Sequence, residues 1–454
     1  MIIVIMIDRD RELCILKEVY DSPKAELVLL YGRRRVGKSR LLVESIKDRK
    51  DAQYFLCDMS NNVLDILAKQ VTVQFVRFGS WDDFFEYVIR GPHRIVIIDE
   101  FQYLALIDSA WPTILQRWWE RLKETDRKVV LCGSILSTIY RISTGYGSAL
   151  YGRRTRDIHV EPLRFGDVRR FLKGYDMTEV VRAYAVLGGV PRYLEEFNTS
   201  RSVRENIRRH IIDRSSFLHN EPMNLMFEEF KDPSSYISII TAILAGNMRF
   251  NEISDRTHIS ASTLPRYLTV LERVRIIERE TPVTETAVKS KKTLYRLSEN
   301  LYAFWFTFIH PNLHQFELGL EDAVMESVDK GLDLFVSATF ECICEQVVVD
   351  AGLIRPTRIG RQWGTMAGAP KGENTYEIDI MAVDANSHQA LFGECKWQLN
   401  VDAPGQLEIL KRKASSIQLK GGKYDVKYTL FARSFRNKID GVCFDLRDFE
   451  RIYR

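Results

Sequence analysis

The sequence predicts an α/β protein of several domains, and three observations support this fold class. The chain has 454 residues, enough for about three domains at roughly 150 residues each. In its first third, short apolar runs alternate with amphipathic helical stretches, which is typical of a mostly parallel sheet covered by helices. Helical spacing then dominates, and strand-like runs with glycine-rich turns return near the C-terminus. We therefore expect an α/β core, a helical middle region and a second α/β unit.

Composition narrows the class of protein without identifying its partners. The formal net charge of +4 is too small to indicate nucleic acid by itself. The 7 cysteines show no Cys-x-x-Cys or Cys/His metal spacing, so we expect reduced thiols. The apolar N-terminal run ends at Asp8, and no other stretch approaches the roughly 18 apolar residues of a membrane span. The expected protein is cytoplasmic and has no membrane partner.

Four apolar runs in the first third are the expected strands of the core. They lie at Glu26–Tyr31, Ala52–Leu56, 94–98 and 128–131. Amphipathic stretches between these runs supply the helices that a parallel sheet needs on both faces. From about residue 160 the apolar spacing is helical, so the core is expected to end there.

The strongest chemical signal is the segment at 32–39, Gly-Arg-Arg-Arg-Val-Gly-Lys-Ser. It matches the phosphate-binding pattern G-x-x-x-x-G-K-[ST] at every fixed position, and it lies between a predicted strand and a predicted helix. In such a loop the glycines let backbone N–H groups approach phosphates, Lys38 reaches the outer phosphates and Ser39 holds Mg²⁺. We expect a nucleoside triphosphate with Mg²⁺, bound by Gly32, Arg35, Val36, Gly37, Lys38, Ser39 and Arg40.

Two carboxylates follow the apolar run at 94–98. Asp99 is placed to bind the Mg²⁺ shell, and Glu100 to orient or deprotonate the attacking water. Acidic residues at strand ends are common, so this assignment depends on the phosphate loop upstream. Ser134 follows the run at 128–131 and is a candidate sensor of the γ-phosphate, although a simple turn explains it equally well.

Residues 8–200 resemble a known family. They are similar to the archaeal ATPase family of P-loop proteins, which is related to the AAA+ and signal-transducing ATPases. Besides the loop and the acidic pair, the resemblance rests on Asp-Arg-Glu-Leu at 10–13, Phe-Gln-Tyr at 101–103, Leu-Tyr-Gly-Arg-Arg at 150–154 and Gly-Gly-Val-Pro-Arg-Tyr-Leu at 188–194. It implies that the nucleotide is ATP, that Arg11 lies near the adenine, and that Pro191 belongs to a lid that contacts the base.

Arg153 and Arg154 are candidates for an arginine finger, because a guanidinium stabilises the charge that spreads over the transferred phosphoryl group. The alternative is that both arginines are solvated or pair with acidic neighbours such as Asp157. A finger that acts in trans would require a homo-oligomer.

The segment 233–311 has the order of a winged helix-turn-helix, with a helix, a short helix, a turn, a helix and a hairpin. The expected recognition helix opens with Ser262, Thr263, Arg266 and Tyr267, and the wing carries the cations Lys289, Lys291, Lys292 and Arg296. This pattern indicates contact with DNA phosphates. The alternative is a rigid connector that packs against the ATPase core, with a solvated lysine-rich hairpin.

Near the C-terminus, two strand-like runs at 376–380 and 391–397 flank a turn at 384–388. If the hairpin pairs Asp384 with Gln389, Asp379 falls opposite Glu394, and Lys396 lies on the same face. Like charges opposite one another destabilise a plain sheet, so a divalent cation between Asp379 and Glu394 would resolve the repulsion. Lys396 would then hold the attacking water or stabilise the phosphate.

The spacing Asp-x14-Glu-x-Lys, after a helix that contains Glu341, is similar to the PD-(D/E)xK nuclease core. This resemblance implies cleavage of DNA with Mg²⁺ or Mn²⁺, with Asp379 and Glu394 as ligands and Glu341 assisting, or Glu345 in its place. The sequence departs from many members of the superfamily, which have a proline before the aspartate. The alternative function is an ATP-driven conformational switch whose C-terminal domain binds without cutting.

The expected fold class is α/β, with a P-loop NTPase core followed by three further regions. We place the core at 1–160, a helical lid at 161–232, a winged helix-turn-helix at 233–311 and a C-terminal α/β nuclease-like domain at 312–454. The expected catalytic residues are Lys38, Glu100, Arg153, Arg154, Asp379, Glu394 and Lys396.

Overall fold

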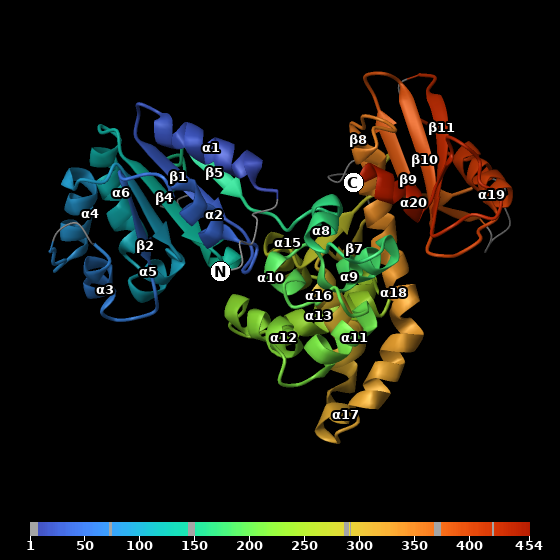
Figure 1. Cartoon of the computed structure of the whole chain (residues 1–454), viewed down its shortest axis with the longest axis horizontal. Helices are drawn as coiled ribbons and strands as arrows, with labels where there is room; N and C mark the ends of the chain where they lie inside the picture. Colours follow the sequence, from blue (N-terminus) through green and yellow to red (C-terminus); the bar gives the residue numbers. More distant parts are fainter. Residues whose placement is uncertain are drawn as a thin grey trace. The chain divides into compact units, whose positions relative to one another are not determined.

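The computed structural model describes residues 8–71, 75–143, 150–285, 290, 292–366, 374–419 and 422–454. These residues form two compact units. Unit 1 runs to Leu163 and includes residues 190–192, and unit 2 contains residues 164–189 and 193–454. In Figure 1, unit 1 is mostly blue to teal, and unit 2 runs from green to red.

Unit 1 is built on a five-stranded parallel sheet with the strand order β2-β3-β4-β1-β5. The strands are β1 (Glu26–Tyr31), β2 (Ala52–Leu56), β3 (Ile95–Asp99), β4 (Lys128–Gly133) and β5 (Arg156–His159). The strands predicted for the core are confirmed as β1 to β4, whereas the short and mostly polar β5 carries no apolar signal. β3 and β4 are buried along their whole length, as strands covered on both faces should be.

Helices cover both faces of this sheet. On one face, α1 (Asp10–Asp21) and α2 (Lys38–Ser45) pack through Leu16 and Leu41 against Ile97. The other face is covered by α3 (Val63–Lys69), α4 (Trp81–Arg90), α5 (Gln102–Ile107), α6 (Trp111–Leu122) and α7 (Leu136–Ser143). This arrangement confirms the predicted α/β core.

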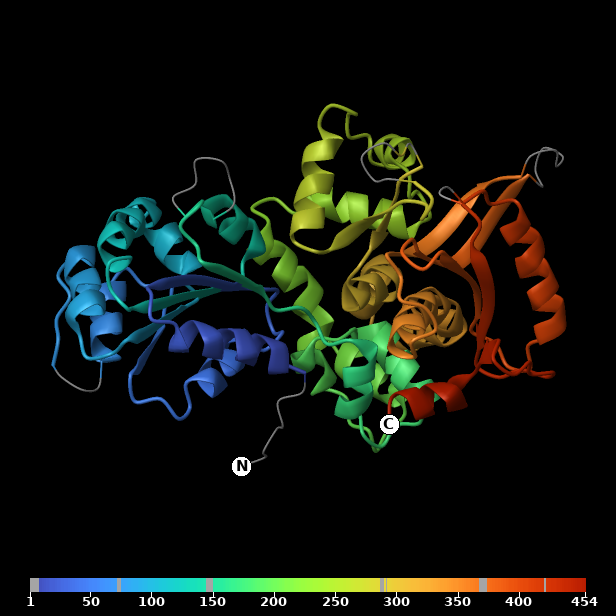
Figure 2. The same cartoon turned by 90° about the horizontal axis from the view of Figure 1, so that it is seen from above.

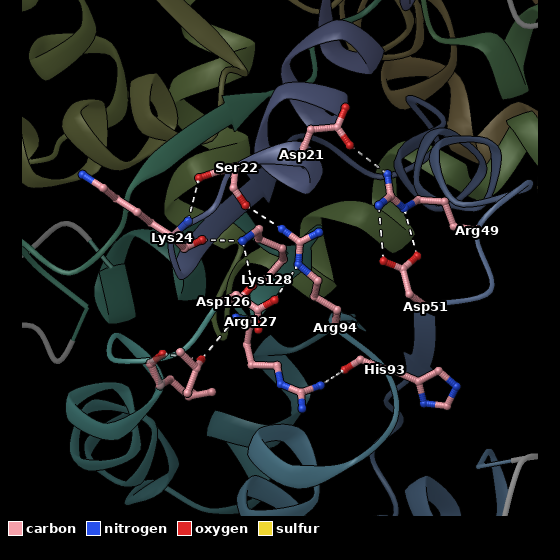
Figure 3. Close-up of polar contacts among 12 residues, drawn as sticks. Asp21, Ser22, Lys24, Arg49, Asp51, His93, Arg94, Asp126, Arg127 and Lys128 are labelled. Atoms are coloured by element: carbon pink, nitrogen blue, oxygen red, sulfur yellow. Dashed lines mark hydrogen bonds and ion pairs between the residues drawn. The ribbon is translucent and has the colours of Figure 1, made fainter.

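The N-terminal ends of the strands are tied together by polar side chains (Figure 3). Lys128, at the start of β4, is buried and donates to the backbone carbonyl of Asp126 at 2.7 Å and to that of Lys24. Arg94, directly before β3, pairs with the Asp126 carboxylate at 3.0 Å. These contacts satisfy a buried ammonium, which would otherwise be costly. They also hold together the N-terminal ends of the strands, opposite to the ends that lead into the loop at 32–39.

Unit 2 begins with a helical region. Its helices are α8 (Phe165–Phe171), α9 (Met177–Leu187), α11 (Val203–Ile207) and α12 (Phe217–Glu229), with the short α10 (Pro191–Leu194) between α9 and α11. α9 is buried over most of its surface and packs against α8, α16 (Asn300–Phe304) and α18 (Glu321–Asp350). In the described part of the chain no helix, α18 included, has the length and apolar character that crossing a membrane requires.

The middle of unit 2 is a winged helix-turn-helix, as predicted. α13 (Ser234–Leu244), α14 (Phe250–Thr257) and α15 (Leu264–Arg273) precede an antiparallel hairpin of β6 (Ile277–Glu280) and β7 (Leu294–Leu297). Leu264, Leu268 and Leu271 bury the inner face of α15. Arg266 on the same helix is exposed. α15 thus presents a polar outer surface, as a recognition helix does.

The C-terminal part of unit 2 is a mixed five-stranded sheet with the order β12-β11-β10-β9-β8. Its strands are β8 (Arg358–Thr365), β9 (Thr375–Asp384), β10 (Gln389–Lys396), β11 (Asp425–Ala432) and β12 (Cys443–Phe444). β8, β9 and β10 pair antiparallel, whereas β10, β11 and β12 pair parallel. The crossover helix α19 (Ala403–Ser415) covers one face, and α18 lies on the other, where α20 (Leu446–Ile452) packs against it (Figures 1 and 2).

The register of the β9–β10 hairpin is the one that the sequence predicts. Gln389 pairs with Asp384, and the pairing runs on to Gly393 and Ile380. The next residues along the two strands are Asp379 and Glu394. The turn at 384–388 therefore brings these two carboxylates onto adjacent positions of neighbouring strands.

The wing is attached to the edge strand β8. The backbone N–H of Val283 donates to the Arg361 carbonyl at 3.3 Å, and that of Thr284 donates to the Gln362 side-chain oxygen at 3.1 Å. The Val283 side chain also packs in the core of the C-terminal sheet. The winged helix and this sheet are therefore joined by backbone and core contacts.

Candidate nucleotide site and C-terminal carboxylate site

The loop at 32–39 follows β1 and leads directly into α2. Arg35 and Gly37 both have left-handed backbone conformations, with φ of 68° and 93°. Gly37 directly precedes α2 as its N-cap residue. At Gly32, an added Cβ would lie 2.3 Å from the Val160 carbonyl oxygen, so a larger residue would displace the neighbouring backbone. The backbone conformation thus explains the glycine at position 37, and close packing explains the glycine at position 32.

Lys38 and Ser39 are the first residues of α2. Lys38 is buried, and its Nζ donates to the Arg33 carbonyl at 2.7 Å. Burial lowers the pKa of Lys38, while nearby acidic groups such as Glu100 and Asp99 act in the opposite direction. The Ser39 hydroxyl donates to the Asp99 carboxylate at 2.6 Å. The loop and the acidic strand end, far apart in the sequence, therefore meet at one site.

The acidic pair lies at the end of β3. Asp99 is fully buried and accepts from the hydroxyls of Ser39 and Tyr54. Glu100 has a left-handed conformation with φ of 56°, and its N–H donates to the Asp99 carboxylate at 2.9 Å. The Ser134 hydroxyl donates to the Glu100 carboxylate at 2.7 Å. Ser134 thus lies beside the candidate base, at the end of the neighbouring strand β4.

Three further contacts hold this site together, and only Gln102 among their donor residues belongs to a segment that the family resemblance singles out. Tyr54 reaches Asp99 from β2, and the Gln102 amide donates to Glu100 from α5. Arg9 is buried and donates to the Val36 carbonyl at 3.1 Å, so it braces the phosphate loop. Arg11, the residue that the family resemblance places near the adenine, is exposed on α1. Tyr54 could have been singled out only from the pairing of its strand β2 with β3, which ends at Asp99.

The remaining residues predicted for this site lie as follows. Arg154 forms an ion pair with Asp157 at 2.7 Å, which is the arrangement that the alternative to an arginine finger expects. Arg153 lies 3.6 Å from the Glu120 carboxylate. Arg40 is exposed on α2, and Pro191 starts α10, in the short segment that belongs to unit 1.

The second candidate site lies just beyond the last pair of the β9–β10 hairpin, Ile380 with Gly393. Asp379 accepts from the backbone N–H of Cys395 at 2.8 Å. Glu394 is buried, at 4% exposure, and Lys396 donates to it at 2.8 Å. Lys413 on α19 donates to both Glu394 carboxylate oxygens, at 2.9 and 2.8 Å. Two lysines therefore neutralise the Glu394 carboxylate. Lys396 is predicted by the motif, whereas Lys413 belongs to no motif.

Carboxylates crowd one another at this site. Burial raises the pKa of Asp379 to about 6, and the Glu394 carboxylate adds to the rise. Burial likewise raises the pKa of Glu341 to about 8, and Asp379 adds to it, while Arg361, at 3.6 Å, opposes the rise. The pKa of Glu345 is raised by burial to about 7, but its charged neighbours lie in the wing and on β8. Of the two candidate glutamates on α18, Glu341 and Glu345, Glu341 is therefore the one beside Asp379.

The donor set at this second site bears on metal binding. Among the described residues, no group of three or more His, Cys, Asp or Glu side chains is arranged to hold a metal ion. Lys396 and Lys413 supply the positive charge beside Glu394 instead. Binding of a cation here would therefore require the side chains to rearrange.

The cations of the wing are engaged by nearby glutamates. Arg296 pairs with Glu278 and Glu280 of β6, at 2.5 and 2.9 Å, because Arg296 lies directly opposite Glu278 in the hairpin. Lys292 pairs with Glu285 at 2.8 Å. The predicted wing residues Lys289 and Lys291 lie outside the described residues. Of the residues predicted to open the recognition helix, Ser262, Thr263 and Arg266 are exposed, whereas Tyr267 is half-buried and packs against Tyr236.

The geometry of unit 1 defines the class of protein. A parallel sheet with a phosphate loop after β1, and with an acidic pair after β3 that accepts from the loop serine, is the architecture of a P-loop ATPase. A family described as an ATPase domain predominantly from Archaea matches residues 6–197. An HxlR-like helix-turn-helix family matches residues 236–304, and a family described as Archaea bacterial proteins of unknown function matches residues 305–407.

A relative that spans the whole chain shows the family. The uncharacterized protein MJECL04 of Methanocaldococcus jannaschii is 32% identical over 456 residues, covering 98% of this chain and 99% of that protein. The chain therefore belongs to the same family as MJECL04, an archaeal family of P-loop ATPases with a helix-turn-helix segment. The uncharacterized ATP-binding protein MJ0423 of the same organism is 42% identical over 48 residues, which are 11% of this chain and 81% of that protein.

A solved structure agrees with the fold. The Walker-type ATPase paby2304 of Pyrococcus abyssi is similar with a TM-score of 0.50 and 20% identity, covering 66% of this chain and 96% of that chain. The predictions of an archaeal-type ATPase and of a helix-turn-helix are thus confirmed. The nuclease-like assignment of the C-terminal sheet stays a prediction.

Proposed function

We propose that this ATPase couples the binding and hydrolysis of ATP to DNA binding and to metal-dependent DNA cleavage. The observation that carries the proposal is the meeting of Asp379, Glu394 and Lys396 at one point of the C-terminal sheet, with Glu341 of α18 beside Asp379. A sheet with no chemical task would gain nothing from this placement, because Glu394 raises the cost of ionising Asp379, and Asp379 raises the cost of ionising Glu341.

In the nucleotide site, each residue has a task set by its position. Lys38 at the start of α2 would bind the outer phosphates in place of the Arg33 carbonyl. The oxygens of Ser39 and Asp99 fit Mg²⁺, which prefers oxygen ligands and would neutralise charge on the β- and γ-phosphates. Glu100 would hold the attacking water, and Ser134 keeps the Glu100 carboxylate in place.

DNA contact would be made by the winged helix. Ser262, Thr263 and Arg266 are exposed at the start of α15, the end of a recognition helix that usually reaches the bases and phosphates. The wing is firmly joined to β8 through Val283 and Arg361. DNA held on α15 would therefore have a fixed direction relative to the C-terminal sheet.

At the carboxylate site, Asp379 and Glu394 would hold Mg²⁺ or Mn²⁺, with Glu341 assisting. The fit rests on the crowding of these carboxyl groups, since a divalent cation would offset the burial and the repulsion from Glu394 that together raise the pKa of Asp379. When bound, such a cation would polarise the scissile phosphate. Lys396 would then leave Glu394 to hold the attacking water or to stabilise negative charge on the phosphate.

A second candidate function is an ATP-driven switch of a DNA-binding protein, in which the C-terminal sheet binds without cutting. One observation favours it: Glu394 already has two lysines, Lys396 and Lys413, and so is electrically satisfied without a metal ion.

A cleavage assay separates the two functions. Linear and branched DNA would be incubated with the chain and Mg²⁺ or Mn²⁺, with and without ATP. We expect cutting by the wild type and by the control Asp425→Asn, whose carboxylate is exposed at the start of β11 in the same sheet. Asp379→Asn should cut at least about 100-fold more slowly. Equal cutting by all three proteins, or cutting by none, would leave the switch as the function.

A further inference from the structure

A groove lies in unit 2 between the winged helix and the C-terminal sheet. It has a volume of about 1050 Å³ and is lined from both sides, by Arg249 and Lys292 of the winged segment and by Trp363, Tyr376, Arg412 and Lys413 of β8, β9 and α19. Glu377 is the carboxylate among its lining residues, against four cationic side chains. Such an excess of positive charge suits a polyanion.

We infer that this groove binds an unpaired DNA strand, with Trp363 stacking on a base and Arg412 contacting a phosphate. The inference rests on the proposed function and specifies its substrate. The groove would then be a second surface for nucleic acid, in addition to α15.

Most cations of the groove are available to phosphates. Arg412 is exposed on α19. Lys292 pairs with Glu285, but its side chain is 54% exposed. Arg249 pairs with Glu252, and its side chain is 62% exposed. Exposed ion pairs of this kind contribute about 0–1 kcal/mol, so a phosphate competes with them readily. Arg412, Lys292 and Arg249 therefore keep positive charge for a phosphate, whereas Lys413 is engaged by Glu394.

The aromatic side chains favour an unpaired strand over a duplex. Bases inside a duplex are stacked on one another, whereas those of a single strand offer free faces to aromatic side chains. Trp363 is half-buried in β8, and it lies opposite Glu377 of β9 in the sheet register. A tryptophan held on a strand in this way is already ordered, so stacking on it costs little conformational entropy.

The groove leads to the carboxylate site. Lys413 lines the groove and also donates to Glu394. Glu377, on the groove wall, precedes Asp379 by two residues on β9. A strand lying in the groove would therefore bring a phosphate toward the carboxylates at which cleavage is proposed.

Fluorescence anisotropy tests the inference with the full chain in the presence of a chelator, so that no cutting occurs. The probes are a labelled oligonucleotide of roughly 16 nucleotides, the upper range for a single-strand site, and the blunt duplex of the same sequence. The variants are Trp363→Ala, Trp363→Phe and Arg412→Ala. The matched control is Lys411→Ala, the preceding residue of α19, which pairs with Glu408.

Trp363→Ala should weaken binding of the single strand about 10-fold or more, and Trp363→Phe should restore most of it because phenylalanine also stacks. Arg412→Ala should lower the slope of log affinity against log salt by about 0.7, the value for one phosphate contact in a single strand. Lys411→Ala should behave as the wild type. Wild-type affinity and salt slope in both Trp363→Ala and Arg412→Ala would overturn the inference, as would tighter binding of the duplex.

Failure of the groove and failure of cleavage give different results. If single-strand binding depends on Trp363 but no cutting depends on Asp379, the groove is a DNA-binding site and the cleavage proposal is wrong. If Asp379-dependent cutting of single strands is unchanged in Trp363→Ala, the cleavage proposal stands and the groove falls.

Discussion

The replacement of Glu341 by glutamine tests whether the carboxyl groups of the C-terminal site are packed as described. Glu341 has a pKa of about 8 against an ordinary value of 4.5, chiefly because it is buried and faces Asp379. The folded protein therefore favours the protonated form. Its contribution to stability is fully present below pH 4.5 and is lost as the pH rises through 8, whereas glutamine has nothing to ionise.

The size of the effect follows from this difference in pKa. A difference of about 3.5 corresponds to roughly 5 kcal/mol at 1.36 kcal/mol per pKa unit. The Glu341 side chain is 24% exposed, and Arg361 lies 3.6 Å away, so solvent and this arginine stabilise part of the charge. We therefore expect about 2 kcal/mol, the part that survives such screening.

Hydrogen–deuterium exchange of peptides from α18 and β9 would measure the local opening free energy near pH 5 and near pH 9. Relative to Glu341→Gln, the wild type should lose about 2 kcal/mol of protection between the two pH values. Parallel pH profiles in the two proteins would refute the idea that Glu341 is held protonated beside Asp379.

Other predictions concern single side chains. Lys38→Ala should reduce ATP hydrolysis by at least about 100-fold, because the outer phosphates lose their cation; a phosphate-release assay would detect any residual turnover. Glu100→Gln should bind ATP with unchanged affinity and fail to hydrolyse it, whereas normal turnover would show that another group positions the water. Lys413→Met should destabilise the chain by about 1–3 kcal/mol, less than for a fully broken buried pair because Lys396 still contacts Glu394; the midpoint of urea unfolding would report it, and an unchanged midpoint would mean that the pair contributes nothing.

The features that could be predicted from the sequence are those with a local signal. The run Glu26–Tyr31 is almost wholly apolar, and the structure has a strand with these bounds. The turn at 384–388 sets the pairing of β9 with β10, since a one-residue slip would turn every side chain to the other face. That register is why Asp379 and Glu394 could be placed on adjacent positions before the fold was known.

The features that could not be predicted depend on contacts between distant residues. Lys413 reaches Glu394 from a helix, and Arg9 reaches the Val36 carbonyl from the start of α1, yet neither belongs to a motif. Arg296 counts as a free cation in the sequence, but the hairpin places Glu278 opposite to it. Cross-strand partners become visible only when the strand register is known, so the charge of the wing is overestimated from sequence.

The most direct test of the account is whether the nucleotide at unit 1 controls cutting at the carboxylate site. DNA cleavage with Mg²⁺ would be followed with and without ATP in the wild type, Lys38→Ala and Asp379→Asn. We predict that ATP changes the cleavage rate of the wild type, that Lys38→Ala cuts at one rate whether or not ATP is present, and that Asp379→Asn hydrolyses ATP normally without cutting. Wild-type cleavage that is insensitive to ATP, or no cleavage at all, would contradict the proposed coupling.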